Sequence, residues 1–141
     1  MTQSSPEQYL AALAQIRDVA QQRAYISNAT GLPSDALIES ISTRIRELLP
    51  RDPDLAQIFA ETNLYIASLV GTTVGWALAN RSRGQVLYTM RKSADAEPLF
   101  NRAVELFEDA GLIGEVGRTL VGQMEATRSG LGWKRPRKER Q

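Results

Sequence analysis

Breaks in the helical pattern recur about every 20 residues, and this spacing constrains the fold more than any other feature of the sequence. Glycine or proline interrupts the pattern at residues 31–33, 50–53, 71–75 and 111–114. Between the breaks, apolar residues lie three and four positions apart, as on one face of an α-helix. No segment alternates polar and apolar residues over six positions, as a half-buried strand would. The chain is therefore expected to be all-α.

Six helices are predicted. The first begins near Pro6, which suits a first turn, and ends before Gly31 and Pro33. Its predicted apolar face consists of Leu10, Leu13, Ile16, Ala20 and Ala24. The other five helices are predicted to begin near residues 34, 53, 74, 94 and 114, with Ser34 and Asp52 as N-caps. Short turns between helices of similar length favour antiparallel hairpins.

Cysteine and histidine are both absent from the 141 residues. Their absence excludes disulfides, cysteine nucleophiles, Ser-His-Asp triads and metal sites that need Cys or His ligands. The carboxylates form no evident acid–base pair, because Glu108 and Asp109 are adjacent and diverge on a helix, and Glu97 and Glu105 are eight residues apart. We therefore expect a protein that is not an enzyme and that uses no metal or other cofactor.

Charge divides the chain into two parts. The formal net charge is +1, but residues 134–141 carry five basic groups and one acid, which leaves residues 1–133 mildly acidic. Residues 1–133 are predicted to form the helical domain, and residues 134–141 a basic, disordered tail. An alternative role for the tail is contact with nucleic acid or an anionic membrane surface, through Lys134, Arg135, Arg137, Lys138 and Arg140.

The sequence predicts no transmembrane segment. The first residues lack the basic start and apolar core of a secretory signal, so a cytoplasmic location is expected. The run Thr62–Asn80 has no charge and is nearly long enough to span a membrane. It also contains several polar residues and a turn-like segment, Gly71–Gly75. Two buried helices that meet at this turn are therefore predicted there.

Two segments of the chain are similar to each other. Leu69–Ala79 aligns with Leu112–Val121 when one gap is allowed, which places Leu78 and Leu120 in equivalent positions. These two residues are 42 positions apart, or about two of the 20-residue helix steps. The similarity favours a repeat of helix pairs.

Residues 77–111 resemble a tetratricopeptide repeat (TPR), in which two helices pack closely as a hairpin. The small residue at the helix crossing corresponds to Gly84, and the Ala-x-x-x-aromatic-x-x-Ala pattern of the second helix is found at Ala96, Phe100 and Ala103. The sequence departs from the family at Asn80 and Arg83, where an aromatic residue and a leucine are usual. The region is also similar to the repeats of bacterial CHAT-type TPR proteins, without their peptidase domain.

The resemblance implies a right-handed superhelical stack of hairpins with a concave groove, lined by the first helix of each pair. It places five residues of one helix on this groove: Leu78, Arg81, Gln85, Tyr88 and Thr89. Arg81 and Gln85 are one turn apart and suit a carboxylate or a peptide backbone, while Tyr88 supplies contact area. The alternative is an ordinary solvated helix face. Thr119, Gln123 and Thr127 extend the predicted surface onto the last helix.

The sequence thus favours a non-catalytic scaffold or adaptor that binds a protein or peptide partner in the groove. The alternative is a regulator associated with nucleic acid or an anionic surface through its basic tail. Three hairpins are about the minimum for a stable array, so either the first helix caps an open end or the chain forms a homo-oligomer.

Overall fold

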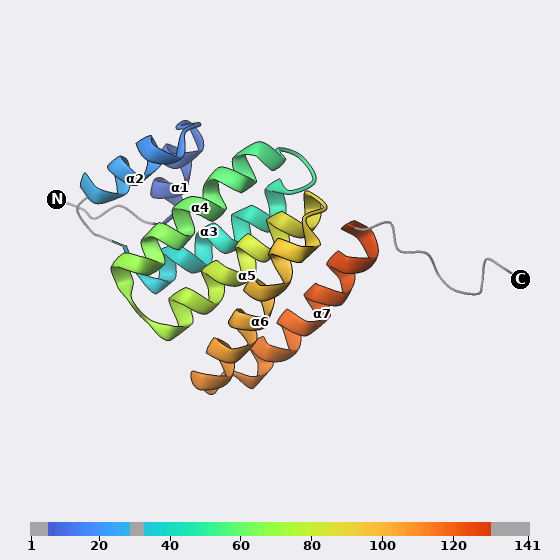
Figure 1. Ribbon diagram of the computed structural model, residues 1–141. Coiled ribbons are helices and arrows are strands. Elements are labelled where there is room, and N and C mark those ends of the chain that lie inside the picture. Colours follow the sequence, from blue (N-terminus) through green and yellow to red (C-terminus); the bar gives the residue numbers. More distant parts are fainter. Residues whose placement is uncertain (1–5, 29–32, 131–141) are drawn as a thin grey trace, which may run out of the picture.

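The computed structural model describes residues 6–28 and 33–130, with side chains described for residues 7–28 and 33–124. In these ranges the chain forms helices and no strand, so the predicted all-α class is confirmed (Figure 1). The helices are α1 (Pro6–Ala14), α2 (Val19–Asn28), α3 (Asp35–Leu48), α4 (Pro53–Val70), α5 (Thr73–Thr89), α6 (Ser93–Asp109) and α7 (Ile113–Gly130).

The prediction of one helix before residue 31 is wrong, because the chain turns between α1 and α2. The backbone N–H of Gln21 donates to the Asp18 carboxylate, which acts as an N-cap for α2. The side-chain amide of Gln22 donates to the carbonyls of Leu13 and Ile16, each at 2.9 Å. These bonds satisfy carbonyls that a continuous helix would have paired with backbone N–H groups. The described residues therefore contain seven helices.

The turn also changes which face of α2 is buried. Ala20 and Ala24, expected on the apolar face, are exposed, whereas Gln22 and Ile26 are buried. The buried side-chain oxygen of Gln22, Oε1, accepts a hydrogen bond from the Thr62 hydroxyl of α4. The apolar spacing in the sequence continues through the turn between α1 and α2. It therefore predicted the wrong buried face for α2.

Three turns between the later helices share a left-handed backbone position. Gly71, Arg91 and Gly111 have φ of 76°, 64° and 75°, and they lie twenty residues apart. The turns at Arg91 and Gly111 also share a hydrogen bond from the next residue back into the helix, from Lys92 N to Leu87 O and from Leu112 N to Phe107 O. This is the pattern of a Schellman cap, which ends a helix and reverses the chain.

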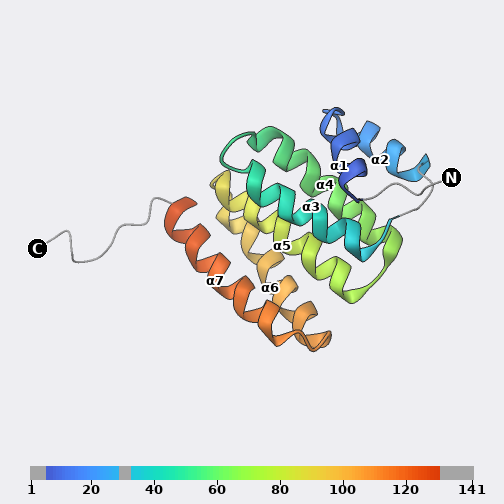
Figure 2. The same ribbon diagram turned by 180° about the vertical axis from the view of Figure 1, so that it is seen from behind.

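Alternate helices contact each other in order. α1 contacts α3, α3 contacts α5, and α5 contacts α7, while α4 packs against α3 and α5, and α6 against α5 and α7. The ribbon accordingly shows successive helices side by side and antiparallel, with α7 at one edge (Figure 2). The helices enclose a core whose largest fully buried side chains include Ile38, Ile41, Ile45, Phe59 and Phe107. Buried residues of α3, α4 and α6 supply most of it.

α5 and α6 pack closely where they meet at Gly84. A Cβ atom on Gly84 would come within 2.9 Å of the Phe100 ring, so only glycine fits without movement of that ring. Ala96 and Ala103 on α6 are both fully buried near this crossing. Small residues here let the two backbones approach, and the aromatic ring fills the space beside them.

The uncharged run Thr62–Asn80 is divided between α4 and α5 by the turn at Gly71, as predicted. Among the described residues, no helix combines the length and apolar character that crossing a bilayer requires.

Candidate functional site

A groove of about 790 Å³ lies between α3 and α7, with α5 as its floor. Each helix contributes one row of lining residues. Three of the α7 residues are glycines, so few large side chains project from α7 into the groove. The lining residues are Glu39, Ser42, Thr43 and Arg46 from α3, Leu78, Arg81 and Gln85 from α5, and Gly114, Glu115, Gly117, Arg118, Val121 and Gly122 from α7.

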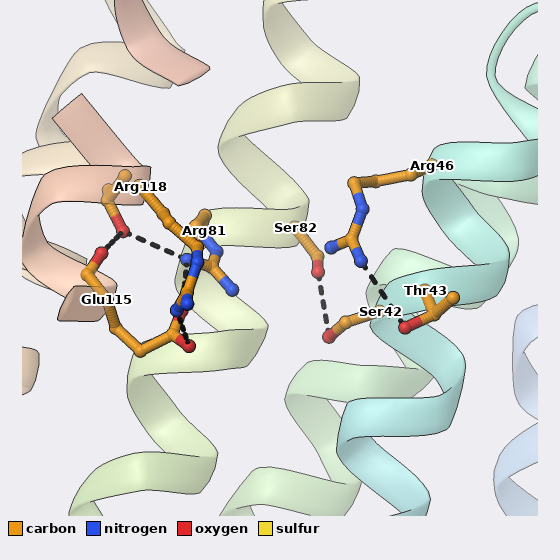
Figure 3. A network of polar contacts seen from close by, with 8 residues as sticks. Ser42, Thr43, Arg46, Arg81, Ser82, Glu115 and Arg118 are labelled. Carbon is orange, nitrogen blue, oxygen red and sulfur yellow. Dashed lines mark hydrogen bonds and ion pairs between the residues drawn. The ribbon is translucent and has the colours of Figure 1, made fainter. Parts of the chain in front are cut away.

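The α3 wall is positioned by apolar packing below and by hydroxyl contacts at the floor. The Ser82 hydroxyl of α5 lies 3.0 Å from that of Ser42, and both side chains are buried (Figure 3). The Asn63 amide of α4 donates to the same Ser42 oxygen at 3.1 Å. One hydroxyl therefore links three helices and fixes the level of α3 relative to α5.

The α7 wall is attached to α5 mainly through Arg81, which is 8% exposed. Its Nη1 donates to Glu115 Oε1 at 2.9 Å and to the Thr119 hydroxyl at 3.1 Å. The guanidinium carbon also lies 5.0 Å from the ring centroid of Phe107 on α6, a cation–π distance. Arg81 thus joins three helices with one side chain.

Glu115 is shared between two arginines. Its Oε1 pairs with Arg81, and its Oε2 accepts from Arg118, one turn later on α7 (Figure 3). The side chain of Arg118 is 69% exposed, whereas that of Arg81 is 10% exposed. The outer half of this arrangement therefore meets solvent in the groove, while the inner half holds α7 in place.

Arg46 faces this cluster from the α3 wall. Its side chain extends over the groove and donates weakly to the Thr43 hydroxyl at 3.4 Å (Figure 3). It forms no ion pair with any acid in the described part of the chain. Arginine is suited to bidentate recognition of carboxylates and phosphates, so Arg46 is a cation open to an anionic group of a ligand.

Gln85 lies at the floor of the groove, one turn after Arg81. Its Oε1 is buried without a hydrogen-bond partner among the described residues. A buried acceptor without a donor costs free energy.

The structure places Leu78, Arg81 and Gln85 on the groove but not all of the predicted set. The placement of Tyr88 there is wrong, because its side chain is 2% exposed and packs on Phe100 with ring centroids 5.2 Å apart. Thr89 is exposed, donates to its own helix at the Gln85 carbonyl and lies outside the lining.

The reason for the error at Tyr88 is geometric. Residues seven apart on a helix differ by only about 20° in direction, so Tyr88 follows Arg81 along the edge of α5 that meets α6. The tyrosine ring ends against Phe100, whereas the longer Arg81 side chain passes Phe107 and reaches α7. Arg81 itself is neither a free groove arginine nor a solvated one, since it pairs within the chain.

Several groove residues were missed by sequence reasoning. Arg46, Glu115 and Arg118 come from different helices, and only the packing of α3 and α7 on α5 brings them to one space. Thr119, predicted as surface, is fully buried beneath Arg81. The predicted basic residues of the tail and the Thr127 side chain lie outside the described residues.

Within the described ranges, no group of three or more Asp, Glu, Cys or His side chains is placed to hold a metal ion. The groove therefore offers hydrogen bonds, charge and shape. In comparisons with known proteins, the chain matches no protein-family model, no curated protein and no solved structure.

Proposed function

We propose that this chain is a non-catalytic scaffold or adaptor whose α3–α5–α7 groove binds an extended, acidic segment of a protein partner. The observation that carries this proposal is the groove itself, in which Arg46, without an ion pair among the described residues, lies opposite the exposed Arg118. A carboxylate side chain of a peptide is the group that matches these two cations.

A TPR-like arrangement of hairpins is part of the proposal. It is supported by the order in which alternate helices contact each other and by the close Gly84–Phe100 crossing. In such an array the first helix of each pair lines the binding surface, and here these helices would be α3, α5 and α7. A preformed surface of this kind loses little entropy on binding an extended segment.

The test is a selection from a random peptide library displayed on phage, with the full chain as bait. Enriched peptides are expected to carry Asp or Glu, and their affinity is then measured by isothermal titration. Arg46→Glu is expected to weaken binding by about tenfold or more, because it places like charge opposite the peptide carboxylate. Arg46 is exposed, so this change leaves the core intact.

The matched control is Arg102→Glu on α6, which makes the same charge change on an exposed face away from the groove. Equal loss of binding in both variants would show a general charge effect and contradict a groove site. A chain that selects no peptide would also contradict the proposal.

The basic tail supports a second candidate, binding of nucleic acid or an anionic surface, because five of the last eight residues are basic. Replacing these five residues with glutamine should leave peptide binding by the groove unchanged. If the tail is the working element, the full chain should instead retain single-stranded or duplex DNA with an affinity that falls steeply with salt.

A further inference from the structure

α7 exposes the apolar side chains that a helix normally buries. Ile113 is 70% exposed, Leu120 46%, Val121 58% and Met124 63%. Among the described side chains of α7, only Thr119 is buried. α7 lies at the edge of the fold, so its outer face is open (Figures 1 and 2). Such a face on a helix is the mark of an interaction surface.

Three of these exposed side chains form a stripe together with one glycine. Ile113, Gly117, Leu120 and Met124 are separated by four, three and four residues, which is the spacing of a coiled-coil seam. A Cβ atom on Gly117 would meet nothing within 4 Å, so this glycine leaves a hollow in the stripe. The hollow lies one turn from the projecting Leu120.

We propose that this stripe pairs, in antiparallel orientation, with the same stripe of a second copy of the chain. The two-fold axis of this pair passes between positions 118 and 119. Each residue of the stripe then lies at the level of the partner residue that is equally far from the axis on the other side. The resulting pairs are Ile113 with the partner's Met124 and Gly117 with the partner's Leu120. Each leucine then fills the hollow at the glycine of the other copy, as a knob fills a hole.

The stripe itself carries no charge. The only charged residues from 113 to 124 are Glu115 and Arg118. Both line the groove beside the stripe, so no charged side chain lies in the seam. The groove arginine Arg118 already pairs with Glu115 in its own chain.

A second copy fits the stripe better than the segment that follows α7. Residues 131–141 contain only two large apolar side chains, Leu131 and Trp133, beside five basic ones. That segment has fewer large apolar side chains than the stripe has exposed ones, which are Ile113, Leu120 and Met124. A single helix pair buries less than the roughly 800 Å² per partner of a stable interface, so the dimer is expected to be weak and reversible.

Sedimentation velocity over a concentration series tests the surface. The full chain is expected to shift from monomer to dimer as concentration rises into the micromolar range. Leu120→Asp is expected to weaken the dimer by about tenfold or more, because it buries a charge opposite the glycine hollow. Leu69→Asp on α4 is the matched control, since Leu69 is also half-exposed, at 50%, but lies outside the stripe.

A chain that stays monomeric at all concentrations would overturn the proposal, as would a dimer that Leu120→Asp leaves unchanged or that Leu69→Asp disrupts equally. Circular dichroism of each variant checks that the helices are intact.

Cysteine cross-linking tests the register, and the absence of native cysteine makes it clean. A mixture of Ile113→Cys and Met124→Cys chains is expected to cross-link with a short bismaleimide, because these positions face each other. Neither variant should cross-link with itself, since identical positions are offset by about 16 Å along the helix axis. Cross-linking of each variant with itself would indicate parallel pairing and overturn the register.

Discussion

The two walls of the groove are held in place by different physical means. α3 presents one wall and buries a full apolar face, with Ile38, Ile41 and Ile45 at 0% exposure. α7 presents the other wall, and its attachment depends on Arg81, Thr119 and the half-buried Val116. Apolar burial is nondirectional and strong, whereas a few polar contacts are directional and individually modest.

The α3 wall is therefore rigid, and the α7 wall is adjustable. Local opening is easiest where few apolar contacts must be broken. α7 is therefore expected to open before α3, and a ligand in the groove would adapt the position of α7 rather than that of α3.

The largest expected effect comes from truncating the α3 wall. Ile41→Ala should lower the free energy of unfolding by about 2–5 kcal/mol, because it removes a fully buried side chain and leaves a cavity. Ile113→Ala on α7 should change it by less than about 0.5 kcal/mol, since that side chain is exposed. Urea denaturation at a concentration where the chain is monomeric measures both, and similar losses would remove the contrast between the walls.

Replacing a glycine in the closely packed α5 and a glycine in α7 tests the same contrast. Gly84→Ala should cost about 1–3 kcal/mol of unfolding free energy, because the new methyl group overlaps the Phe100 ring. Gly122→Ala on α7 should instead add about 0.5–1 kcal/mol, since its Cβ meets nothing and alanine favours the helix. Thermal or urea unfolding gives the sign of each change. If Gly84→Ala stabilised the fold, α5 and α6 would be packed less closely than the 2.9 Å between the added Cβ atom and the Phe100 ring implies.

Removing the polar attachment should loosen only one wall. Arg81→Met leaves Glu115 and Thr119 without their inner partner, at a cost of about 1–2 kcal/mol. Amide hydrogen exchange, followed by mass spectrometry, should become faster in α7 and stay unchanged in α3.

Arg102→Met serves as the control for Arg81→Met, since Arg102 is exposed and its one ion pair among the described residues is with Glu105, one turn away. Exchange that accelerates evenly over the whole chain in Arg81→Met would show that α7 is not a separate unit.

The smallest expected effect is a pH dependence on the α3 side of the molecule. The hydrogen bond from Arg17, followed by that from the Leu55 backbone N–H, lowers the pKa of Asp52 below its ordinary value. A carboxyl whose pKa is lower in the folded state stabilises the fold above its unfolded pKa, and this contribution is lost as the pH falls.

The urea midpoint should therefore decrease below about pH 4, the ordinary pKa of an aspartate, because there the unfolded chain binds the proton more readily than the folded chain does. Asp52→Asn keeps the N-cap but cannot titrate, so its midpoint should fall less over the same range. An equal decline in the two proteins would assign the acid sensitivity to other carboxyls.

Much of the fold could be predicted from the sequence because its signals are local. Ser34, Asp52, Gly71 and Gly111 mark helix ends through their own backbone and capping chemistry, and the structure uses each of them. The turn between α1 and α2 was missed because it depends on the tertiary bonds of Gln22, to carbonyls nine and six residues away.

The groove was less predictable than the helices. The resemblance to a tetratricopeptide repeat placed Leu78, Arg81 and Gln85 in one row, and the structure finds that row in the groove. It could not show that the Arg81 side chain is used to hold α7, or that Tyr88 ends on Phe100, because both depend on where α6 and α7 lie. Arg46 could not be assigned for the same reason, since its partners in space are distant in sequence.

The even spacing of the left-handed turn residues has a consequence for how such a chain changes length. Gly71 and Gly111 both end a helix with the same backbone hand, and forty residues separate them. A tandem duplication of residues 72–111 would therefore join the new hairpin at a glycine already suited to a reversal. The array could grow by whole hairpins, and its binding surface would lengthen by one helix at a time, without a new kind of junction.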